Sequence, residues 1–314
     1  MQFDRRSTLA LLGAGMLTSC RAPGAVPLRV GSQRAGMKSL MQASGVLEGL
    51  GFPLEWADFP AGQQLLEALG VGAVDLGGVG DAAFLFAYEA GSPIRSVRTT
   101  HHEPRNADLA IIVPKLSPIR KVEDMVGRKV ATGRGSAGHF LLLRALHNAR
   151  IPIKSVNIVF LSPGDAKGAF GSGAVDAWST WNPYAATELL HNDGRIIADG
   201  RNFSAGYGFI AAHIPAIQAK RAQIAEFLKR YVQAEAWATK NVAAFADVLK
   251  HETGLPADVA YYVADRTRVA VRIDARVINE QREVLKTFED AGIVKVNRPL
   301  EPAFDTSFDE GLLG

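Results

Sequence analysis

The chain has 314 residues, of which 47% are apolar and 21% are charged, and its formal net charge is +3. This length is sufficient for a full hydrophobic core and predicts two domains. So small a positive charge does not favour nucleic-acid binding. After residue 20 no stretch is long and apolar enough to span a bilayer. We therefore expect a folded protein that has no nucleic acid among its partners.

The first nineteen residues predict an export signal peptide. Arg5 and Arg6 form a short basic region, and the residues from Leu9 to Leu17 form an apolar run of the right length. The run is followed by Thr18, Ser19 and Cys20. An export signal places the mature protein in the periplasm or on the outside of the cytoplasmic membrane.

Cys20 is the only cysteine in the chain, which excludes a disulfide within one chain. Its setting resembles the lipobox of bacterial lipoproteins, in which the cysteine is lipidated and becomes the first mature residue. Residues 20–27 would then form a short tether, and the lipid would be the only contact with the membrane. In the alternative, an ordinary signal is cleaved nearer Ala22 or Ala25 and the cysteine is incidental.

Strand-like and helix-like segments alternate from residue 28 to residue 198. Strands are predicted at 28–31, 54–59, 74–77, 94–100, 109–113, 129–132, 156–161, 176–179 and 195–198. Helices are predicted at 37–50, 63–69, 81–90, 121–125, 137–149, 165–170 and 183–190. This alternation indicates an α/β fold in which helices cover both faces of mostly parallel sheets.

One hexad, Gly-X-Gly-Ala-Val-Asp, occurs at residues 70–75 and again at residues 171–176. Each copy follows a helix-like stretch and leads into a short strand, a turn and another helix. The repetition predicts two similar α/β lobes with the working site in the cleft between them. We expect the hexads to be structural and to lie behind the cleft, and the residues just after each hexad to line it.

The C-terminal part differs from the rest of the chain. Residues 206–213 predict a strand that returns to the first lobe, whereas residues 215–246, 256–266 and 275–291 are helix-periodic with little strand signal. We expect the first lobe to comprise residues 28–113 and 208–314, with the extra helices packed on it, and the second lobe residues 114–207. Connections near 113–116 and 203–208 would form a two-strand hinge.

Three strand-to-helix junctions are rich in small residues, at positions 77–81, 132–139 and 179–184. In parallel α/β sheets ligands bind at the carboxyl ends of strands, where helix N-termini offer free N–H groups to anions. The junction at 132–139 lacks the Gly-Lys-Ser/Thr ending of a P-loop. On its own it could equally be a tight turn, but three such junctions favour a ligand cleft.

Candidates for catalysis or metal binding are weak. No cysteine remains as a nucleophile in the folded part, and His101, His102 and Glu103 read as a polar loop without a second cluster at ligand spacing. Ser136 and His139 are too little to suggest a hydrolase triad. His139 is the only histidine placed to touch a ligand, although local capping or packing is an equal alternative. We expect no catalytic residue, no metal and no cofactor.

Several stretches resemble one known family, the aliphatic sulfonate-binding proteins of bacterial ABC importers. The resemblance covers nearly all of residues 28–295 in order. Taurine, nitrate and sulfate-ester binders are similar. The stretches that carry it are residues 59–69, 113–115, 133–146, 161–163 and 176–184.

The resemblance implies a periplasmic-binding-protein type II fold whose two lobes close on a small organosulfonate. It also implies delivery to a membrane permease powered by a separate ATPase, a task that suits a monomer. Carried over position by position, the ligand-facing residues of the family fall on Gln33, Gly80, Asp81, Gly135, Ser136, Ala137, His139, Trp181 and Asn182.

We expect these residues to have different roles in binding the ligand. Ser136 and the backbone N–H groups near Gly80 and Ser136 would hold the sulfonate. Gln33 would donate from the first lobe, and Trp181 would shield the alkyl part.

The chain departs from the family at four places. It has Ser32 where the family commonly has Tyr, Val79 where it has Thr, Ala82-Ala83 where it has a proline pair, and Asn182 where it has Asp. These differences leave the exact substrate open among a sulfonate, taurine, a sulfate ester, nitrate, and a pyrimidine or aromatic compound. An enzyme on the same fold is the other alternative, since desulfinases and thiamine-precursor synthases resemble such proteins.

Overall fold

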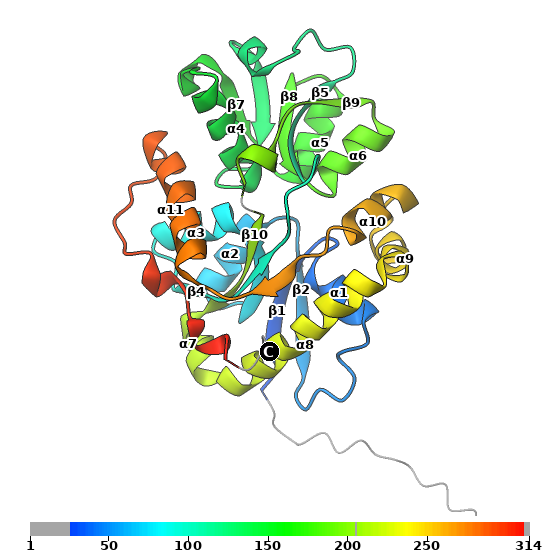
Figure 1. Ribbon diagram of the computed structural model, residues 1–314, viewed down its shortest axis with the longest axis vertical. Coiled ribbons are helices and arrows are strands. Elements are labelled where there is room, and N and C mark those ends of the chain that lie inside the picture. The colour runs from blue at the N-terminus through cyan, green and yellow to red at the C-terminus, as the bar shows by residue number, and fades with distance from the viewer. Residues whose placement is uncertain (1–25, 205, 311–314) are drawn as a thin grey trace, which may run out of the picture.

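The computed structural model describes residues 26–204 and 206–310 of the protein. The predicted signal peptide (1–19), Cys20 and most of the predicted tether lie outside the described residues. The described chain forms two α/β lobes, each built on its own sheet, one above the other in Figure 1. The predicted fold class is therefore confirmed.

A six-stranded sheet forms the larger lobe, with the strand order β11-β4-β10-β3-β1-β2. In it β1 pairs in parallel with β2 and β3, whereas β10 is antiparallel to β3 and β4, and β11 is antiparallel to β4. The strands are β1 (Leu28–Gln33), β2 (Leu54–Phe59), β3 (Leu76–Gly80), β4 (Ile94–His101), β10 (Tyr207–His213) and β11 (Val269–Val271).

A five-stranded sheet forms the smaller lobe, with the order β7-β6-β8-β5-β9. Here β6 is parallel to β7 and β8, and β5 is antiparallel to β8 and β9. The strands are β5 (Leu109–Pro114), β6 (Lys129–Thr132), β7 (Asn157–Phe160), β8 (Ala177–Trp181) and β9 (Gly194–Asp199).

The assignment of β5 corrects a prediction. We expected residues 109–113 to belong to the first lobe, but they pair with β8 and β9 of the second. The first connection between the lobes therefore runs through residues 102–108, not 113–116, and the second lies between β9 and β10. The two connections touch, since the His102 N–H donates to the Gly206 carbonyl over 3.3 Å. A Cβ on Gly206 would lie 2.0 Å from the His102 oxygen, so this close contact requires glycine.

Helices cover both faces of each sheet. They are α1 (Met37–Ala43), α2 (Gly62–Gly70), α3 (Asp81–Glu89), α4 (Ala137–Asn148), α5 (Pro163–Gly171), α6 (Tyr184–His191), α7 (Ile214–Ala219), α8 (Arg221–Lys240), α9 (Val242–Thr253), α10 (Ala257–Ala264) and α11 (Ala275–Asp290). Short 3₁₀ helices are η1 (Val122–Met125), η2 (Ile153–Ser155), η3 (Gly200–Asn202), η4 (Glu301–Ala303) and η5 (Thr306–Phe308). The helix predicted over 37–50 ends at Ala43, and residues 46–49 form turns.

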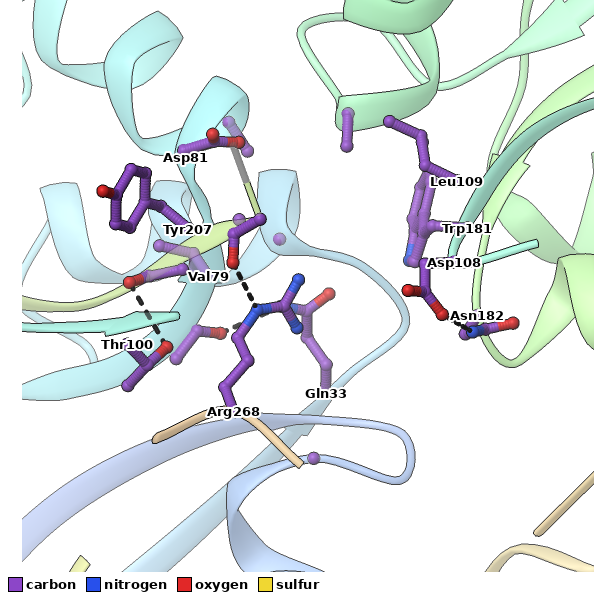
Figure 2. A pocket seen from close by; sticks show the side chains of 18 of the residues that line it. Gln33, Val79, Asp81, Thr100, Asp108, Leu109, Trp181, Asn182, Tyr207 and Arg268 are labelled. Carbon is purple, nitrogen blue, oxygen red and sulfur yellow. Dashed lines mark hydrogen bonds between the residues drawn. The ribbon is translucent and has the colours of Figure 1, made fainter. Parts of the chain in front are cut away.

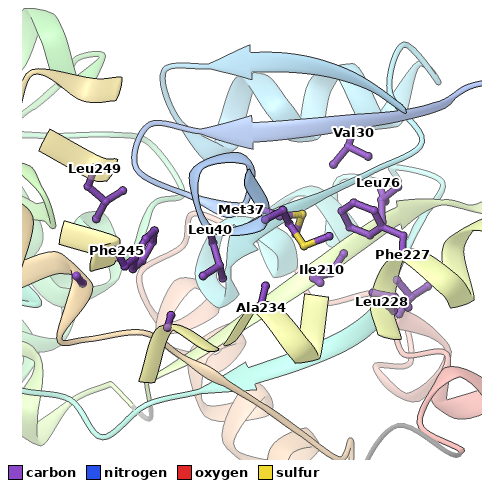
Figure 3. Close-up of a cluster of buried hydrophobic side chains, with 14 of the residues drawn as sticks. Val30, Met37, Leu40, Leu76, Ile210, Phe227, Leu228, Ala234, Phe245 and Leu249 are labelled. Carbon is purple, nitrogen blue, oxygen red and sulfur yellow. The ribbon is translucent and has the colours of Figure 1, made fainter. Parts of the chain in front are cut away.

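The cores follow the alternation of side chains along the strands. On β10, Ile210 faces the cluster made with α1, α8 and α9, which Figure 3 shows, whereas Phe209 faces the cluster made with α2, α3 and α11. On β5, Ile111 faces α4, and Ile112 packs in the opposite cluster with Trp178. Both sheets are thus buried on both faces, which explains why their strands read as nearly continuous apolar runs.

The C-terminal helices do more than pack on the first lobe. Helix α11 contacts α3 of the larger lobe and also α4 of the smaller lobe, and α10 contacts α6. Figure 1 shows these two helices on opposite sides of the junction between the lobes. The same segment contains β11, a strand that its sequence pattern did not predict.

Both hexads end in an aspartate that holds the first parallel strand of its lobe. The Asp75 N–H donates to the Arg29 carbonyl over 2.8 Å, and the Asp75 side chain accepts the Arg29 N–H over 2.7 Å. The Asp176 N–H and side chain make the same pair of bonds with Lys129, each of 2.8 Å. Neither hexad lies in the cleft between the lobes, and the strand after each one leads there.

The two aspartates differ in burial and charge partners. Asp75 is 1% exposed and binds the Arg29 guanidinium at 2.7 Å and the Lys220 ammonium at 2.6 Å. Although burial acts to raise it, these hydrogen bonds hold the pKa of Asp75 below its ordinary value. Asp176 is 37% exposed, and the Arg128 guanidinium with which it pairs is 3.8 Å away.

This difference predicts unequal effects of the same substitution. Asp75→Asn would leave the half-buried Lys220 ammonium without its anion, so we expect the free energy of unfolding to fall by about 3 kcal/mol. Asp176→Asn should cost less than about 1 kcal/mol, because its ion pair is long and solvated. Urea unfolding of both variants at pH 7 measures the difference. Equal losses in the free energy of unfolding would show that the buried ion pair of Asp75 stabilises the fold no more than the exposed pair of Asp176.

Candidate functional site

A cavity of about 280 Å³ lies between the two lobes and is lined by both. Its walls include the ends of β1, β3 and β8 and the two connections between the lobes. Seven of the nine predicted ligand-facing residues are brought together there: Gln33, Gly80, Asp81, Ser136, Ala137, Trp181 and Asn182. Figure 2 shows Gln33 and Arg268 on one side of the space and Trp181, Leu109 and Asn182 on the other.

Gln33 ends β1 on the wall of the larger lobe. Its Nε2 donates to the Gly78 carbonyl over 2.9 Å, which fixes the carboxamide beside β3. Because an amide nitrogen carries two hydrogens, one N–H remains for a ligand. Val79, where the related family has Thr, is almost fully buried and offers no hydroxyl.

Asp81 is the first residue of α3 and is 7% exposed. Its Oδ1 accepts the N–H of Ala82 over 2.7 Å. Burial raises the pKa of Asp81 to about 6, against the lowering effects of that hydrogen bond and of the Arg268 charge. The carboxyl is therefore costly to keep ionised in this wall.

Ser136 caps helix α4 on the wall of the smaller lobe. Its Oγ accepts the His139 N–H over 3.2 Å and donates to the Gly133 carbonyl over 2.7 Å. The hydroxyl proton is thus already used within the turn. The junction presents the first turn of α4, which begins at Ala137, to the cavity. The N–H groups at the start of a helix lack the carbonyl partner that a preceding turn would supply.

Trp181 and Asn182 form the third junction. The Trp181 ring packs edge-on against Tyr184, with ring centroids 6.1 Å apart. The Asn182 Nδ2 donates to Asp108 over 3.2 Å, and its Oδ1 accepts the Ala186 N–H over 3.3 Å. Asp108 itself forms an ion pair with Arg266, with 2.8 Å between Nε and Oδ1, so Asn182 belongs to a polar network that reaches the C-terminal segment.

Two predicted residues do not reach the cavity. His139 is 0% exposed, its Nδ1 accepts the Gly135 N–H over 3.1 Å, and its ring packs against Phe160 and Phe288. Burial lowers the pKa of His139 to about 4, so the ring is neutral at pH 7. Gly135 has φ +68, and a Cβ there would lie 2.7 Å from Phe86. Both residues serve packing between the lobes, as the alternative for His139 anticipated.

Arg268 is the residue that the sequence pattern missed. It lies just before β11, lines the cavity, and its Nε donates to the Gly206 carbonyl over 3.4 Å. Dense surrounding protein lowers its pKa, while the charges of Asp81, Tyr231, Asp108 and Glu235 act to raise it. The side chain is nevertheless accessible from the open space of the cavity. Nothing in its local sequence distinguishes it from the other basic residues of a helix-periodic tail.

Within residues 26–204 and 206–310, no three His, Cys, Asp or Glu side chains are grouped so as to hold a metal ion. No described helix has both the length and the apolar character needed to cross a membrane. The cavity instead offers a guanidinium, amide donors, helix N-termini and an indole, which suits an organic anion.

Similarity to known proteins agrees with this chemistry. A family described as NMT1/THI5-like matches residues 56–244. A curated protein of Escherichia coli (strain K12), named for binding aliphatic sulfonates, is 34% identical over 272 residues, which are 85% of this chain and 85% of that protein. The structure of the alkanesulfonate-binding protein SsuA from Xanthomonas axonopodis pv. citri, bound to MOPS, is 31% identical, with a TM-score of 0.83 over 89% of this chain and 98% of that one.

An enzyme shares the fold as well. The desulfurization enzyme DSZB is 15% identical to this chain, with a TM-score of 0.65 over 90% of this chain and 97% of the enzyme. Such low identity shows the common fold alone, because one fold carries many functions. The two relatives above, both more than 30% identical over most of the chain, are named as binding proteins.

The raised pKa of Asp81 predicts how its removal changes stability. A carboxyl whose pKa is about 6 in the folded state and 3.8 when unfolded favours folding fully below pH 3.8 and loses that contribution as the pH rises through 6. Asp81→Asn keeps an acceptor for the Ala82 N–H and does not titrate. At pH 7.5 the variant should be more stable than the wild type by on the order of 3 kcal/mol, and near pH 3.5 the two should be equal.

Chemical denaturation at several pH values measures this difference. Asp58→Asn is the matched control, because the Asp58 side chain is 68% exposed and forms a surface ion pair with Lys38. The control should change stability by less than about 1 kcal/mol at every pH. A loss of stability in Asp81→Asn at pH 7.5 would contradict the conclusion that the ionised Asp81 carboxylate destabilises the folded state.

Proposed function

The chain belongs to the NMT1/THI5-like family, among the aliphatic sulfonate-binding proteins, and we propose that it captures a small organosulfonate between its lobes outside the cytoplasm. The observation that carries the proposal is the placement of the Arg268 guanidinium and Trp181 indole on opposite walls of one cavity (Figure 2). A sulfonate has a permanently charged head and an apolar body, so it needs both kinds of wall.

The head group is assigned to the side of Gln33 and Arg268. A sulfonate offers three acceptor oxygens around one sulfur and has no proton to donate at neutral pH. The guanidinium supplies several N–H donors in a fixed plane, and the Gln33 carboxamide supplies another. The N-terminus of α3 at Gly80 adds a partial positive charge.

The smaller lobe contributes through helix α4 and the aromatic junction. Ser136 acts here by capping α4 through the His139 N–H, and the start of the helix at Ala137 faces the cavity with its partial positive charge. Trp181 covers the carbon part of the ligand. The neutral Asn182 does not repel an anion, as a carboxylate at that position would.

Capture by two lobes fits delivery to a transporter. Ligand contacts with both walls would stabilise the closed arrangement about the two connections, and a permease of an ABC importer would recognise that form. We further propose that the mature chain is a monomer held at the membrane by a lipid on Cys20, without any other membrane contact.

The proposal includes no catalytic step. A desulfinase-like enzyme would need a cysteine nucleophile, and the only cysteine of this sequence is Cys20, at the predicted end of the export signal. Release of sulfite from an aryl sulfinate by the purified protein would overturn this part of the proposal.

Calorimetry with a panel of ligands tests the substrate class. The mature protein, beginning at residue 20 with Cys20→Ser to remove the free thiol, is titrated with short alkanesulfonates, taurine, a sulfate ester, nitrate and an aminopyrimidine. We expect saturable binding of the alkanesulfonates with one site per chain. Heat from nitrate or the pyrimidine, and none from any sulfonate or sulfate ester, would refute the assignment.

Arg268 gives the sharpest test of the binding geometry. Arg268→Gln removes a charged donor in a partly desolvated wall, so affinity for an alkanesulfonate should fall roughly 10- to 100-fold. Arg268→Lys keeps the charge without the planar fork and should give an intermediate loss. Arg120→Gln, at an exposed position outside the cavity lining, removes the same charge and should leave affinity within about twofold. Wild-type affinity in Arg268→Gln would exclude the residue from the head-group site.

A further inference from the structure

A second hollow adjoins the ligand cavity. It has a volume of about 420 Å³ and lies between α2 and α3 of the larger lobe and residues 133–135 and 160–163 of the smaller one. Its walls are mainly apolar. The apolar side chains on which the argument depends are Leu66, Ala83, Phe86, Ala87, Phe160 and Leu161. We call this hollow the tail groove.

The tail groove and the ligand cavity adjoin each other along both lobes. In the larger lobe Gln63 and Ala83 line both spaces. In the smaller lobe residues 133–135 border the groove, and the next two residues, Ser136 and Ala137, border the cavity. The same two segments of chain therefore pass from one space to the other.

Gln63 marks the boundary between them. Its Nε2 donates to the Arg134 carbonyl over 3.0 Å, which is a direct contact between the lobes. Gly133 lies against the same carboxamide, and a Cβ there would be 3.5 Å from the Gln63 Nε2. The half-buried Gln63 side chain thus lies at the boundary between the cavity and the groove, bonded to the backbone of the smaller lobe.

The chemistry of the groove is unsuited to a second anionic head group. Its one lining guanidinium, Arg134, lies over the Phe160 ring, with 4.0 Å from Cζ to the ring centroid, and the groove also contains the Glu67 carboxylate. The rest of the lining is mostly alanine, leucine and phenylalanine, together with the polar side chains of Gln63, Gln64, Ser92 and Ser162. Such a surface gains free energy by excluding water from hydrocarbon, at about 25 cal/mol for each Å² buried.

We propose that the tail groove receives the hydrocarbon tail of a long-chain alkanesulfonate or an arylsulfonate whose head group lies in the cavity. The inference rests on the proposed function and extends it to a substrate class. The cavity alone is slightly smaller than most small-molecule sites, whereas the cavity and groove combined fall within the usual range. The tail leaves the cavity past Gln63. Ligands of different length then differ in how much of the tail contacts the groove beyond this residue.

The test compares ligands of increasing length on a variant that fills the groove. Ala87 lines the groove and not the cavity, so Ala87→Trp should block the tail without touching the head-group site. For the wild type, affinity should rise by about fourfold for each methylene that enters the groove, and by roughly 20-fold or more from butane- to octanesulfonate. In Ala87→Trp the affinity for butanesulfonate should stay within about threefold of wild type, and the gain with length should disappear.

Two further variants keep the test decisive. Val71→Trp places the same bulky ring at a surface position that is 82% exposed and should reproduce the wild-type series. Ala90→Trp, at the outer, exposed end of the groove, should leave hexanesulfonate unaffected and weaken octanesulfonate alone. If Ala87→Trp fails to fold, the Ala90→Trp series decides the question.

The outcomes separate the two proposals. Absence of binding by every sulfonate, short or long, refutes the proposed function and the groove with it. Binding of short chains with no gain from length, or with an equal gain in Ala87→Trp, overturns the groove alone. Isotherms that require two independent sites for octanesulfonate would show a separate apolar site and would also overturn it.

Discussion

The site depends on one hydrogen bond, from a backbone N–H to an aspartate side chain, that is made once in each lobe. In each lobe the aspartate that closes the hexad accepts an N–H from the first parallel strand, at Arg29 in one lobe and Lys129 in the other. The contact fixes the register in which the next strand, β3 or β8, lies beside β1 or β6. Because parallel strands end at a common edge, this register decides which residues reach the cleft.

The consequence is visible on both walls. In the larger lobe, β3 delivers Gly80 and Asp81 beside Gln33 at the end of β1. In the smaller lobe, β8 delivers Trp181 beside the capped start of α4. The repeated hexad is therefore remote from the ligand, yet it sets the position of the residues that line the cavity.

The C-terminal segment adds what the repeated units lack. Helices α10 and α11 contact the smaller lobe as well as the larger one, and Arg266 joins the network of Asp108 and Asn182 at the crossing. The same segment supplies Arg268. The cation of the site and part of the contacts between the lobes thus come from one stretch of chain. Binding an anion and holding the lobes together are therefore physically coupled.

Sequence reasoning succeeded where the signal is local. Alternating periodicity identified the α/β fold, and small residues at strand ends located three junctions that the structure brings to one cavity. Sequence reasoning failed where the position of a segment depends on which strands it pairs with in the folded protein. The apolar run of β5 fits either sheet, and only its partners β8 and β9 assign it. The position of Arg268 follows from a three-residue strand pairing with β4, which no periodicity in a helix-rich tail indicates.

The two buried carboxyl groups whose charges act on Arg268, Asp81 and Glu235, differ in protonation at neutral pH. Burial raises the pKa of Asp81 to about 6 and the pKa of Glu235, which is almost fully buried on α8, to about 8. The Ala270 N–H, the Tyr231 hydroxyl and the charges of Arg98 and Arg268 act to lower the pKa of Glu235, but burial outweighs them. At neutral pH Glu235 is therefore mostly protonated, and it does not neutralise the guanidinium. Asp81, whose pKa is about 6, is mostly ionised at pH 7, and its charge acts on Arg268. An anion that enters the cavity therefore meets a guanidinium whose charge Asp81 offsets in part and Glu235 does not.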